Sequence, residues 1–481
     1  MQWIIAAVLI LAVLVGYISA AYDFKMIVVV IAGAALFWSV IKWPRWGLVL
    51  IIAFMSTILA PEFLGSYVNT NFVYYAQEIL LFLIVAASLI SWSRRNPGIG
   101  IFTRLFSSPQ MIAFTIFFAV VLIKALAIMI ERRFEFSTIS SMYNFNRSLT
   151  FYLLFIPVLL LLDTRDRVRW MVRVMYALGI FTMVRILLQL IFPHWGIWTY
   201  ISLSEPLATE TPFVDVSVQR LRSPGGTIVL ACFWTGIMFM VLQSWTWKRL
   251  AFYVPFTLVM LAGMILEFNR SYILPMGGLL VLVMLLNRKN VRIKLLTVVA
   301  VTIMVLALLA AFTGSTQKYI DAATVRFGTA LSSQSLESQS LTSRQIEQNY
   351  AWESIRGAPL FGIGLDEYYR PPVPGLLDNL RWYIHDTYIW FWTYYGIIGL
   401  GAFLAIMVTA LVRSAFNWKR ITDPMLQAAL IGLAFAVVTM IAANFAAPKF
   451  YDYATVPAVA MILGLIEAII LSERRRDSAL S

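Results

Sequence analysis

The sequence predicts an all-α protein that crosses a membrane many times. Of its 481 residues, 61% are hydrophobic and only 13% are charged, whereas a soluble domain has about 45–50% apolar and about 25% charged residues. So few polar residues would not cover the surfaces of soluble domains. The chain also contains many apolar runs of about 20 residues, the length that spans the hydrocarbon core of a bilayer. Together these observations indicate a polytopic membrane protein.

The apolar runs predict fourteen transmembrane helices, at 2–21, 26–42, 46–61, 73–92, 110–130, 148–162, 168–192, 226–243, 250–267, 271–287, 293–313, 388–412, 426–446 and 453–472. We expect about eleven of them within residues 1–313. A long loop with short helices follows at 314–387, and residues 388–481 hold three more helices and a short tail. The first run has no basic residues before it, which favours a retained helix over a cleaved signal peptide.

The basic residues divide unequally between the two sides of this topology. The loops on the side of both termini hold 20 Lys and Arg residues, and the opposite loops hold 8 when 314–387 is left out. The positive-inside rule therefore predicts cytoplasmic termini, with the long loop outside, in the periplasm. The net charge of +13 follows from this topology, so we expect no nucleic-acid partner.

The long loop predicts one soluble helix, from Ser343 to Arg356. Thr342 and Gln345 form a capping pattern at its start, and Gly357-Ala358-Pro359 ends it. A long ordered outer loop of this kind is typical of a lid or a binding element. The alternative is a loop that only connects two spans.

The residue inventory excludes several kinds of site. Cys232 is the single cysteine, and the histidines are His194 and His385. A disulfide framework or a cysteine metal site is therefore impossible, and a site made of histidines is not expected. No Asp-x-Asp pair occurs on the outer side and no Walker loop occurs anywhere. We expect neither a metal nor a cofactor, and we interpret His194, beside Trp195, as interfacial packing.

Five ionisable residues lie well inside predicted spans: Glu78, Lys124, Arg173, Arg185 and Glu467. Charges at this depth cost a few kcal/mol each and need a reason. Arg173 and Glu467 lie close to the cytoplasmic ends of their helices. The other three lie in outward halves, which predicts a polar cavity opening outward, although each could instead reach the outer interface.

Cations or a histidine precede three spans that begin on the outer side. Arg220 and Arg222 precede the span at 226, Arg270 precedes Ser271, and His385 precedes the span at 388. The start of a helix offers free N–H groups to phosphate, and arginine adds charge and bidentate hydrogen bonds. The pattern predicts a metal-free diphosphate site, with His385 as a candidate base. The alternatives are interfacial charges and a histidine that holds the loop end.

The segment from Arg344 to Phe403 resembles the signature of the O-antigen ligase and Wzy-type polymerase superfamily. The shared features are an arginine, a tryptophan in a helix, a glycine turn, a His-x-x-Tyr motif and a second glycine motif. They stand here as Arg344, Trp352, Pro359-Leu360-Phe361-Gly362-Ile363-Gly364, His385-Asp386-Thr387-Tyr388 and Gly396-Ile397-Ile398-Gly399-Leu400. Asn269-Arg270-Ser271 and Arg220-Leu221-Arg222-Ser223-Pro224-Gly225 resemble the arginine motifs. Asp386 replaces the usual Asn, and Asn269 replaces the usual Ser.

The resemblance implies an inverting glycan transfer at the outer face of a bacterial inner membrane. Its donor would be a glycan on undecaprenyl diphosphate, and its acceptor a glycan or a lipid A core. The candidate catalytic residues are His385, Arg270 and Arg222. The candidate substrate-binding residues are Arg220, Lys124, Arg185, Arg344, Asp386, Tyr388 and Trp352. Trp352, with Tyr368, Tyr369 and Trp382, would stack on sugar rings, and the spans would hold the lipid tail.

Several functions remain open at this point. Fourteen spans favour a polysaccharide polymerase slightly over an O-antigen ligase, and a chain-length regulator is a conceivable partner. A flippase or transporter would also suit many spans and an outward cavity, but we find no related halves, which such proteins often show. A non-catalytic scaffold would explain the loop but not the outward-facing charges.

Overall fold

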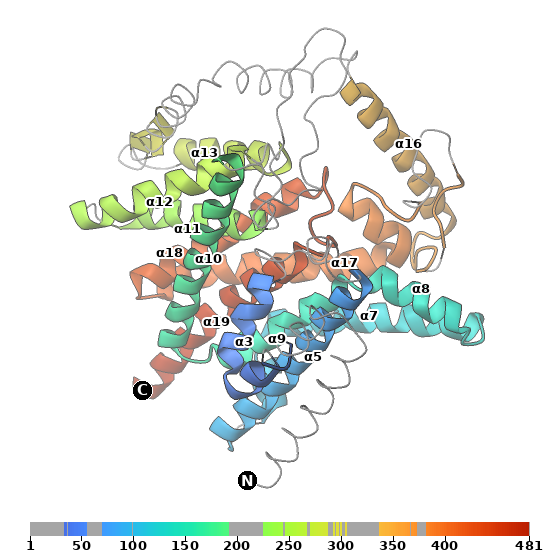
Figure 1. Ribbon diagram of the computed structural model, residues 1–481, viewed down its shortest axis with the longest axis horizontal. Helices are drawn as coiled ribbons and strands as arrows, with labels where there is room; N and C mark the ends of the chain where they lie inside the picture. Colours follow the sequence, from blue (N-terminus) through green and yellow to red (C-terminus); the bar gives the residue numbers. More distant parts are fainter. Residues whose placement is uncertain are drawn as a thin grey trace, which may run out of the picture.

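In the computed structural model, the regular secondary structure of the described residues is entirely helical (Figure 1). These residues are 33–54, 70–191, 225–297, 299, 300, 304, 336–372 and 381–480, without positions 36, 99, 244, 245, 267–269, 287–291, 294 and 366. The predicted span 2–21, residues 26–32 of the second span and most of 293–313 lie outside them. The all-α prediction is confirmed for the described part of the chain.

The first half of the chain forms α3 (Pro44–Ala53), α5 (Thr70–Arg95), α6 (Ile101–Phe106), α7 (Pro109–Glu131), α8 (Phe136–Asn146), the 3₁₀ turn η2 (Leu149–Leu154), α9 (Phe155–Leu161) and α10 (Arg165–Ile191). The second half forms α11 (Gly226–Leu242), α12 (Trp247–Leu266), α13 (Arg270–Leu286), α16 (Leu336–Gly357), α17 (Thr387–Asn417), η6 (Trp418–Arg420), α18 (Pro424–Ala443) and α19 (Val456–Leu480).

Six segments of the described chain are long and apolar enough to cross a membrane: Tyr75–Arg95, Pro109–Glu131, Phe136–Leu161, Thr387–Arg420, Pro424–Ala443 and Val456–Arg474. Shorter apolar helices include α3, α11 and parts of α12 and α13. The protein is therefore a membrane protein, as its composition predicted. The number of fourteen spans and their orientation remain predictions.

Prolines and capping side chains set the starts of two long helices, α7 and α18. Pro109 and Pro424 occupy the first turns of α7 and α18, where a missing N–H has no consequence. The Ser108 hydroxyl accepts a hydrogen bond from the Met111 amide, and the Asp423 carboxylate accepts from Met425 and Leu426. These caps satisfy N–H groups that the helix itself leaves unpaired.

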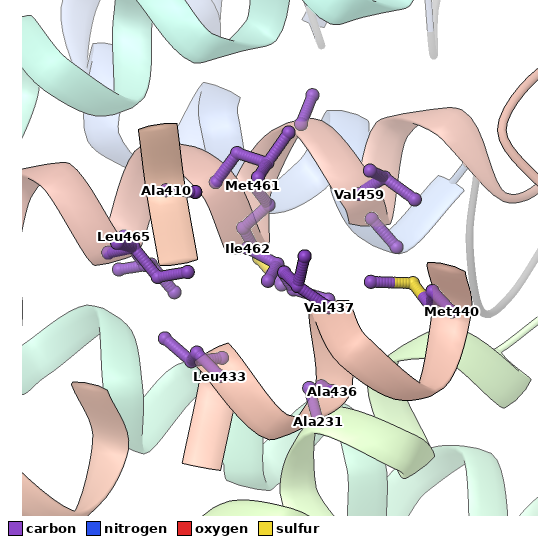
Figure 2. Close-up of a cluster of buried hydrophobic side chains, with 14 of the residues drawn as sticks. Ala231, Ala410, Leu433, Ala436, Val437, Met440, Val459, Met461, Ile462 and Leu465 are labelled. Atoms are coloured by element: carbon purple, nitrogen blue, oxygen red, sulfur yellow. The ribbon is translucent and has the colours of Figure 1, made fainter. Parts of the chain in front are cut away.

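The core lies where α19 passes between the other long helices. The membrane-length part of α19 is completely buried, and it packs against α9, α10, α17 and α18. Side chains of α11, α17, α18 and α19 meet in the cluster of Figure 2. Gly432 of α18 lies against the backbone of Thr235 in α11, where a Cβ atom would overlap it. Small residues thus permit close helix contacts, as is usual in membrane proteins.

Buried ion pairs satisfy two carboxylates within the predicted spans, Glu78 and Glu467. The Arg413 guanidinium of α17 donates two hydrogen bonds to Glu467 of α19, at 2.6 and 2.8 Å, and Arg147 pairs with Glu78 of α5. A buried charge requires such a partner. These two carboxylates therefore have structural partners that the sequence analysis did not identify.

The two ends of the bundle carry different groups. At one end, named here the Arg95 end, Arg95 and Arg167 pair with Asp163, and Arg169 pairs with Asp423. The opposite end, named the His385 end, holds α8, α16, the start of α17 and the loop 444–455. The positive-inside rule predicts that the Arg95 end faces the cytoplasm.

Two helices differ from the sequence predictions. Residues 136–146 form α8, although they lie between the predicted spans 110–130 and 148–162, where no helix was expected. The helix predicted from Ser343 begins at Leu336 instead, so the capping pattern at Thr342 does not mark its start. Its end at Gly357 agrees with the Gly-Ala-Pro signal. Both segments are polar, and apolar runs, the signal that predicts membrane spans, do not mark such helices.

Candidate active site

His385 pairs with a carboxylate at the His385 end. Its Nδ1 atom lies 2.8 Å from Oε2 of Glu347 on α16. The Glu347 residue is buried, whereas 34% of the His385 side chain is exposed. The edge of the imidazole also packs against the ring of Tyr383, with centroids 4.9 Å apart and planes at 85°. One ring nitrogen is thus engaged by a carboxylate while the side chain remains accessible.

Backbone contacts on both sides fix the position of His385. The Tyr451 hydroxyl donates to the Ile384 carbonyl, and the Tyr369 hydroxyl donates to the Tyr383 carbonyl at 3.0 Å. The Thr387 hydroxyl donates to the Asn444 side chain at 2.6 Å. The histidine therefore stands on a segment held by two loops. Such support limits the motion of a functional side chain.

Asp386 is the cap of α17. Its Oδ1 atom accepts hydrogen bonds from the Tyr388 and Ile389 amides, at 2.8 and 3.1 Å. Burial raises the pKa of the Asp386 carboxyl above its ordinary value, although these two hydrogen bonds act in the opposite direction. The sequence predicts a substrate-binding role for Asp386. The observed contacts are those of a helix cap, and the carboxylate that contacts His385 is Glu347.

Tyr388 and Trp352 also have neighbours within the protein. The Tyr388 hydroxyl donates to the Ile441 carbonyl at 2.5 Å and so joins α17 to α18. The Trp352 indole is 40% exposed and meets Trp392 edge-on, with centroids 5.5 Å apart. Trp352 keeps a free surface that suits a sugar ring, whereas the Tyr388 hydroxyl is already engaged.

Arg344 lies on the same helix as Glu347, three residues earlier. Residues three apart lie on one face of a helix, so the guanidinium and the carboxylate lie on the same side of α16. The Arg344 Nε atom is buried without a hydrogen-bond partner among the described residues. Its place beside the His385–Glu347 pair keeps it as a candidate substrate ligand.

The glycine turn at 358–364 fits into a break in α17. Gly396 has φ +69 and interrupts the helix, so the Ile397 amide loses its helical acceptor. That amide donates to the Pro359 carbonyl at 2.9 Å, and the Ile363 amide donates to the Thr393 carbonyl at 2.8 Å. The turn thus replaces the hydrogen bonds that the break removes. The two glycine motifs of the resemblance are therefore two halves of one contact.

Lys124 of α7 contributes to the same contact. Its Nζ atom donates to the Gly362 carbonyl at 2.9 Å, and Gly362 and Gly364 both have positive φ, which only glycine adopts without strain. The sequence analysis proposed Lys124 as a substrate ligand. Its observed partner is the turn, so one of its hydrogen bonds serves the structure.

The break also divides α17 by composition. The 21 residues from 397 to 417 are long enough to cross the hydrocarbon core. The piece before the break, Thr387-Tyr-Ile-Trp-Phe-Trp-Thr-Tyr-Tyr395, is aromatic, the composition of a membrane–water interface. His385 precedes this piece, so the composition predicts a position at the interface rather than in the hydrocarbon.

The starts of α11 and α13 lie together at the same end of the bundle. The Thr227 hydroxyl lies 2.9 Å from the Tyr272 hydroxyl, and the Lys449 ammonium lies 5.5 Å from the centre of the Tyr272 ring. Gly225 packs directly against Thr182 of α10. Arg185 is buried on α10, three residues beyond Thr182. Two helix starts and cations of two further segments therefore share one region.

The loop 444–455 connects this region to His385. Lys449 lies on it beside Tyr272, while Asn444 binds Thr387 and Tyr451 binds the Ile384 carbonyl. Arg270 is the first residue of α13, and the structure describes its backbone only. Arg220 and Arg222 lie outside the described residues, directly before α11. The starts of α11, α13 and α17 thus lie at one end of the bundle, and the convergence of Arg222 and Arg270 on His385 stays a prediction.

Sequence reasoning missed Glu347 and Lys449. Glu347 lies within the helix predicted at 343–356, one turn after Arg344, so a carboxylate on that helix face was the available signal. Lys449 entered only the count of loop charges, because nothing in the sequence places it beside Tyr272. Among the described residues, no three His, Cys, Asp or Glu side chains gather in a way that would hold a metal ion.

In the comparison with known proteins, no curated protein matches the chain. Residues 255–404 match the family model described as O-antigen ligase. The match runs from α12 to the middle of α17 and includes Arg270, Arg344, Trp352 and His385. It confirms the resemblance that the motifs indicated, and the family implies a membrane enzyme of glycosyl transfer.

Proposed function

We propose, from the O-antigen ligase match at 255–404 and the His385 geometry, that this protein is an inverting glycan transferase facing the periplasm. Its donor is an oligosaccharide on undecaprenyl diphosphate. The observation that supports this most is an accessible imidazole, backed by a carboxylate, close to clustered helix starts. In this proposal residues 314–387 form the periplasmic loop between two membrane regions, and both termini are cytoplasmic.

The proposed reaction is a single displacement at the anomeric carbon. An acceptor hydroxyl attacks this carbon, its oxygen forms the new glycosidic bond, and the bond from carbon to the diphosphate oxygen breaks. The proton of the hydroxyl passes to His385, and the lipid diphosphate leaves as an anion. A positioned base of this kind contributes about 10²–10⁴-fold in rate.

Fixed positive charge stabilises the leaving diphosphate in this proposal. The candidates are Arg222, Arg270 and Arg220 at the starts of α11 and α13, and Lys449 beside Tyr272. Helix N-termini add partial positive charge. Because these groups supply the charge, the proposal requires no metal ion; preorganised charge of this kind is often the largest catalytic contribution.

Reconstitution with a lipid-linked repeat unit tests the proposal. We expect wild-type protein in proteoliposomes to release undecaprenyl diphosphate and form a glycosidic bond. His385→Ala and Arg270→Ala should abolish the product while the protein still expresses. Lys449→Met should raise the donor KM, whereas Lys419→Met, exposed at the Arg95 end, should not. Normal products from both His385→Ala and Arg270→Ala would refute the proposal.

The acceptor decides between two related activities. We favour a polysaccharide polymerase slightly, because fourteen predicted spans exceed the usual count for ligases. The family description itself favours an O-antigen ligase. Long products without lipid A core would indicate a polymerase, to which a chain-length regulator could bind. Products only on lipid A core would indicate a ligase. Movement of the lipid-linked glycan between leaflets without bond formation would indicate a flippase.

A further inference from the structure

We propose that Glu347 is the positioning residue for His385: it holds the imidazole with its hydrogen on Nδ1 and so leaves Nε2 free to take the acceptor's proton. This inference rests on the proposed function, and it assigns to a residue of α16 a role that the sequence motifs do not contain. The juxtaposition that supports it is the 2.8 Å contact between Nδ1 and the buried Glu347 carboxylate.

The chemistry of the His385–Glu347 pair determines which ring nitrogen carries the hydrogen. An ionised carboxylate has no hydrogen to donate, so the 2.8 Å contact requires the hydrogen on Nδ1. A neutral imidazole carries only one such hydrogen, and Nε2 then has a lone pair. With part of the His385 side chain exposed, that lone pair can reach a substrate hydroxyl. As the imidazole takes the proton, the carboxylate also stabilises the cation that forms.

The contact is not what docks α16 on α17. The buried side chains Ala351 and Ile355 pack this helix, and the Ser354 hydroxyl donates to the Tyr369 carbonyl at 3.2 Å. Trp352 meets Trp392, whose indole donates to the Pro359 carbonyl at 3.0 Å. A change at Glu347 that keeps its volume should therefore leave the fold intact. This separates a positioning role from a purely structural one.

The other groups around the imidazole cannot replace the carboxylate. Burial raises the pKa of the Tyr369 and Tyr451 phenols, so both stay neutral in the working range of the enzyme, and Asp386 is engaged as the cap of α17. The titratable and charged groups near His385 are Arg344 and Glu347 on α16, Tyr369 and Arg370, Tyr383 and Asp386, and Tyr451. Glu347 is the one carboxylate in contact with His385 in the described part of the chain.

Kinetics of Glu347→Gln provide the first test, with Glu353→Gln as the matched control because Glu353 is exposed on the same helix. We expect Glu347→Gln to lower kcat by on the order of 10²-fold, with little change in the donor KM. The acidic limb of its kcat/KM profile should move to lower pH, because an imidazolium without its anion loses its proton more readily. Glu347→Asp keeps the charge, so it should recover part of the lost kcat and reverse part of the shift in the pH profile. Glu353→Gln should match the wild type.

Nitrogen NMR of the imidazole provides a test that does not depend on activity. The chain has only two histidines, so His194→Gln leaves His385 as the single signal in protein labelled with ¹⁵N-histidine. We expect the Nδ1–H tautomer in this variant and a mixture or the other tautomer when Glu347→Gln is added. The same tautomer and the same pH profile in both proteins would overturn the inference.

Failure of the proposed function and failure of the positioning role would give different results. If wild-type protein forms no glycosidic bond with any acceptor, the proposed function fails, even when the spectrum shows the tautomer that Glu347 imposes. If the wild type is active and His385→Ala is inactive, but Glu347→Gln behaves like Glu353→Gln, the function stands and the positioning role is wrong.

Discussion

At the scale of single residues, the carboxylate of Asp386 closes the start of α17, and its burial gives this cap a pH dependence. Since burial raises the pKa of the carboxyl above its ordinary value of 3.8, the folded protein binds this proton more tightly than the unfolded chain does. The contribution of Asp386 to stability therefore decreases as the pH rises from 3.8 through the raised value.

Substitutions of Asp386 should separate the stability that comes from capping α17 from the pH dependence that comes from the carboxyl charge. Asp386→Asn keeps an oxygen for the Tyr388 and Ile389 amides, so we expect it to retain the cap and to lose the decline of stability with rising pH. Asp386→Ala should lower the free energy of unfolding by about 1 kcal/mol. Thermal unfolding of the detergent-solubilised protein between pH 3 and pH 8 measures both. Equal pH dependence in Asp386→Asn and wild type would contradict the expectation.

Asp423, at the Arg95 end of the bundle, contributes to stability with the opposite pH dependence. Burial acts to raise the pKa of this carboxyl, but hydrogen bonds from the Leu426 amide and Arg169 and the charges of Arg169 and Arg165 outweigh it, so the net direction is downward. Its stabilisation is complete above the ordinary value of 3.8 and is lost as the pH falls through the lowered value. Asp423→Asn should therefore destabilise at neutral pH, where Asp386→Asn does not.

At the scale of the element, Gly396 determines the shape of α17. Its φ of +69 disfavours any residue with a Cβ atom, and such an atom would overlap the Leu360 carbonyl of the glycine turn. We expect Gly396→Ala to lower stability by at least about 1–3 kcal/mol and to reduce transferase activity. Gly401→Ala on the same helix, where nothing lies within 4 Å, should be neutral or slightly stabilising. Thermal unfolding and turnover of both variants check this.

Equal behaviour of the two glycine variants would show that the break in α17 is not required. A loss confined to Gly396→Ala would instead show that the fit between the turn and the break is necessary. The comparison is fair because both glycines lie in the same helix and both changes add a single methyl group.

The elements themselves were largely predictable, because apolar runs, prolines and caps are local signals. Pro109, Pro424 and Asp386 mark helix starts that the structure places within two residues of the prediction. The polar helix α8 and the early start of α16 were missed because their stability does not come from apolar periodicity. The break at Gly396 was also missed, since only its contact with residues 358–364 explains it.

The candidate site was predictable in part for a similar reason. Motifs along the chain identified His385 and the helix starts, and loop 444–455 joins their surroundings. Glu347 comes from a helix 38 residues earlier. On this polar helix, the sequence does not distinguish Glu347 from the other glutamates. Its partner becomes visible only once α16 is packed on α17.

At the scale of the whole molecule, the orientation of the bundle is the prediction that decides which compartment the site faces. The Arg95 end carries the paired arginines, and the His385 end carries Glu367, which is exposed beside Arg132. Because Cys232, the only cysteine, is buried, new cysteines can be labelled against a low background. We expect Glu367→Cys to react with a membrane-impermeant thiol reagent in cells with a permeable outer membrane.

Arg94→Cys supplies the control, since Arg94 is exposed at the opposite end. It should react only after the inner membrane is opened. Labelling of Arg94→Cys in unopened cells, together with protection of Glu367→Cys, would reverse the topology. That result would place His385 in the cytoplasm and remove the proposed access to a periplasmic acceptor.

Because the glycine turn fits into the break in α17, these two segments, which are distant in the chain, should open together. The amides of Ile363 and Ile397 are 34 positions apart in the chain, yet each is covered by the other's segment. Neither can meet solvent unless the turn lifts away from α17, so their hydrogens should exchange with deuterium at one common rate. The contact between the glycine turn and α17 should therefore open as one unit.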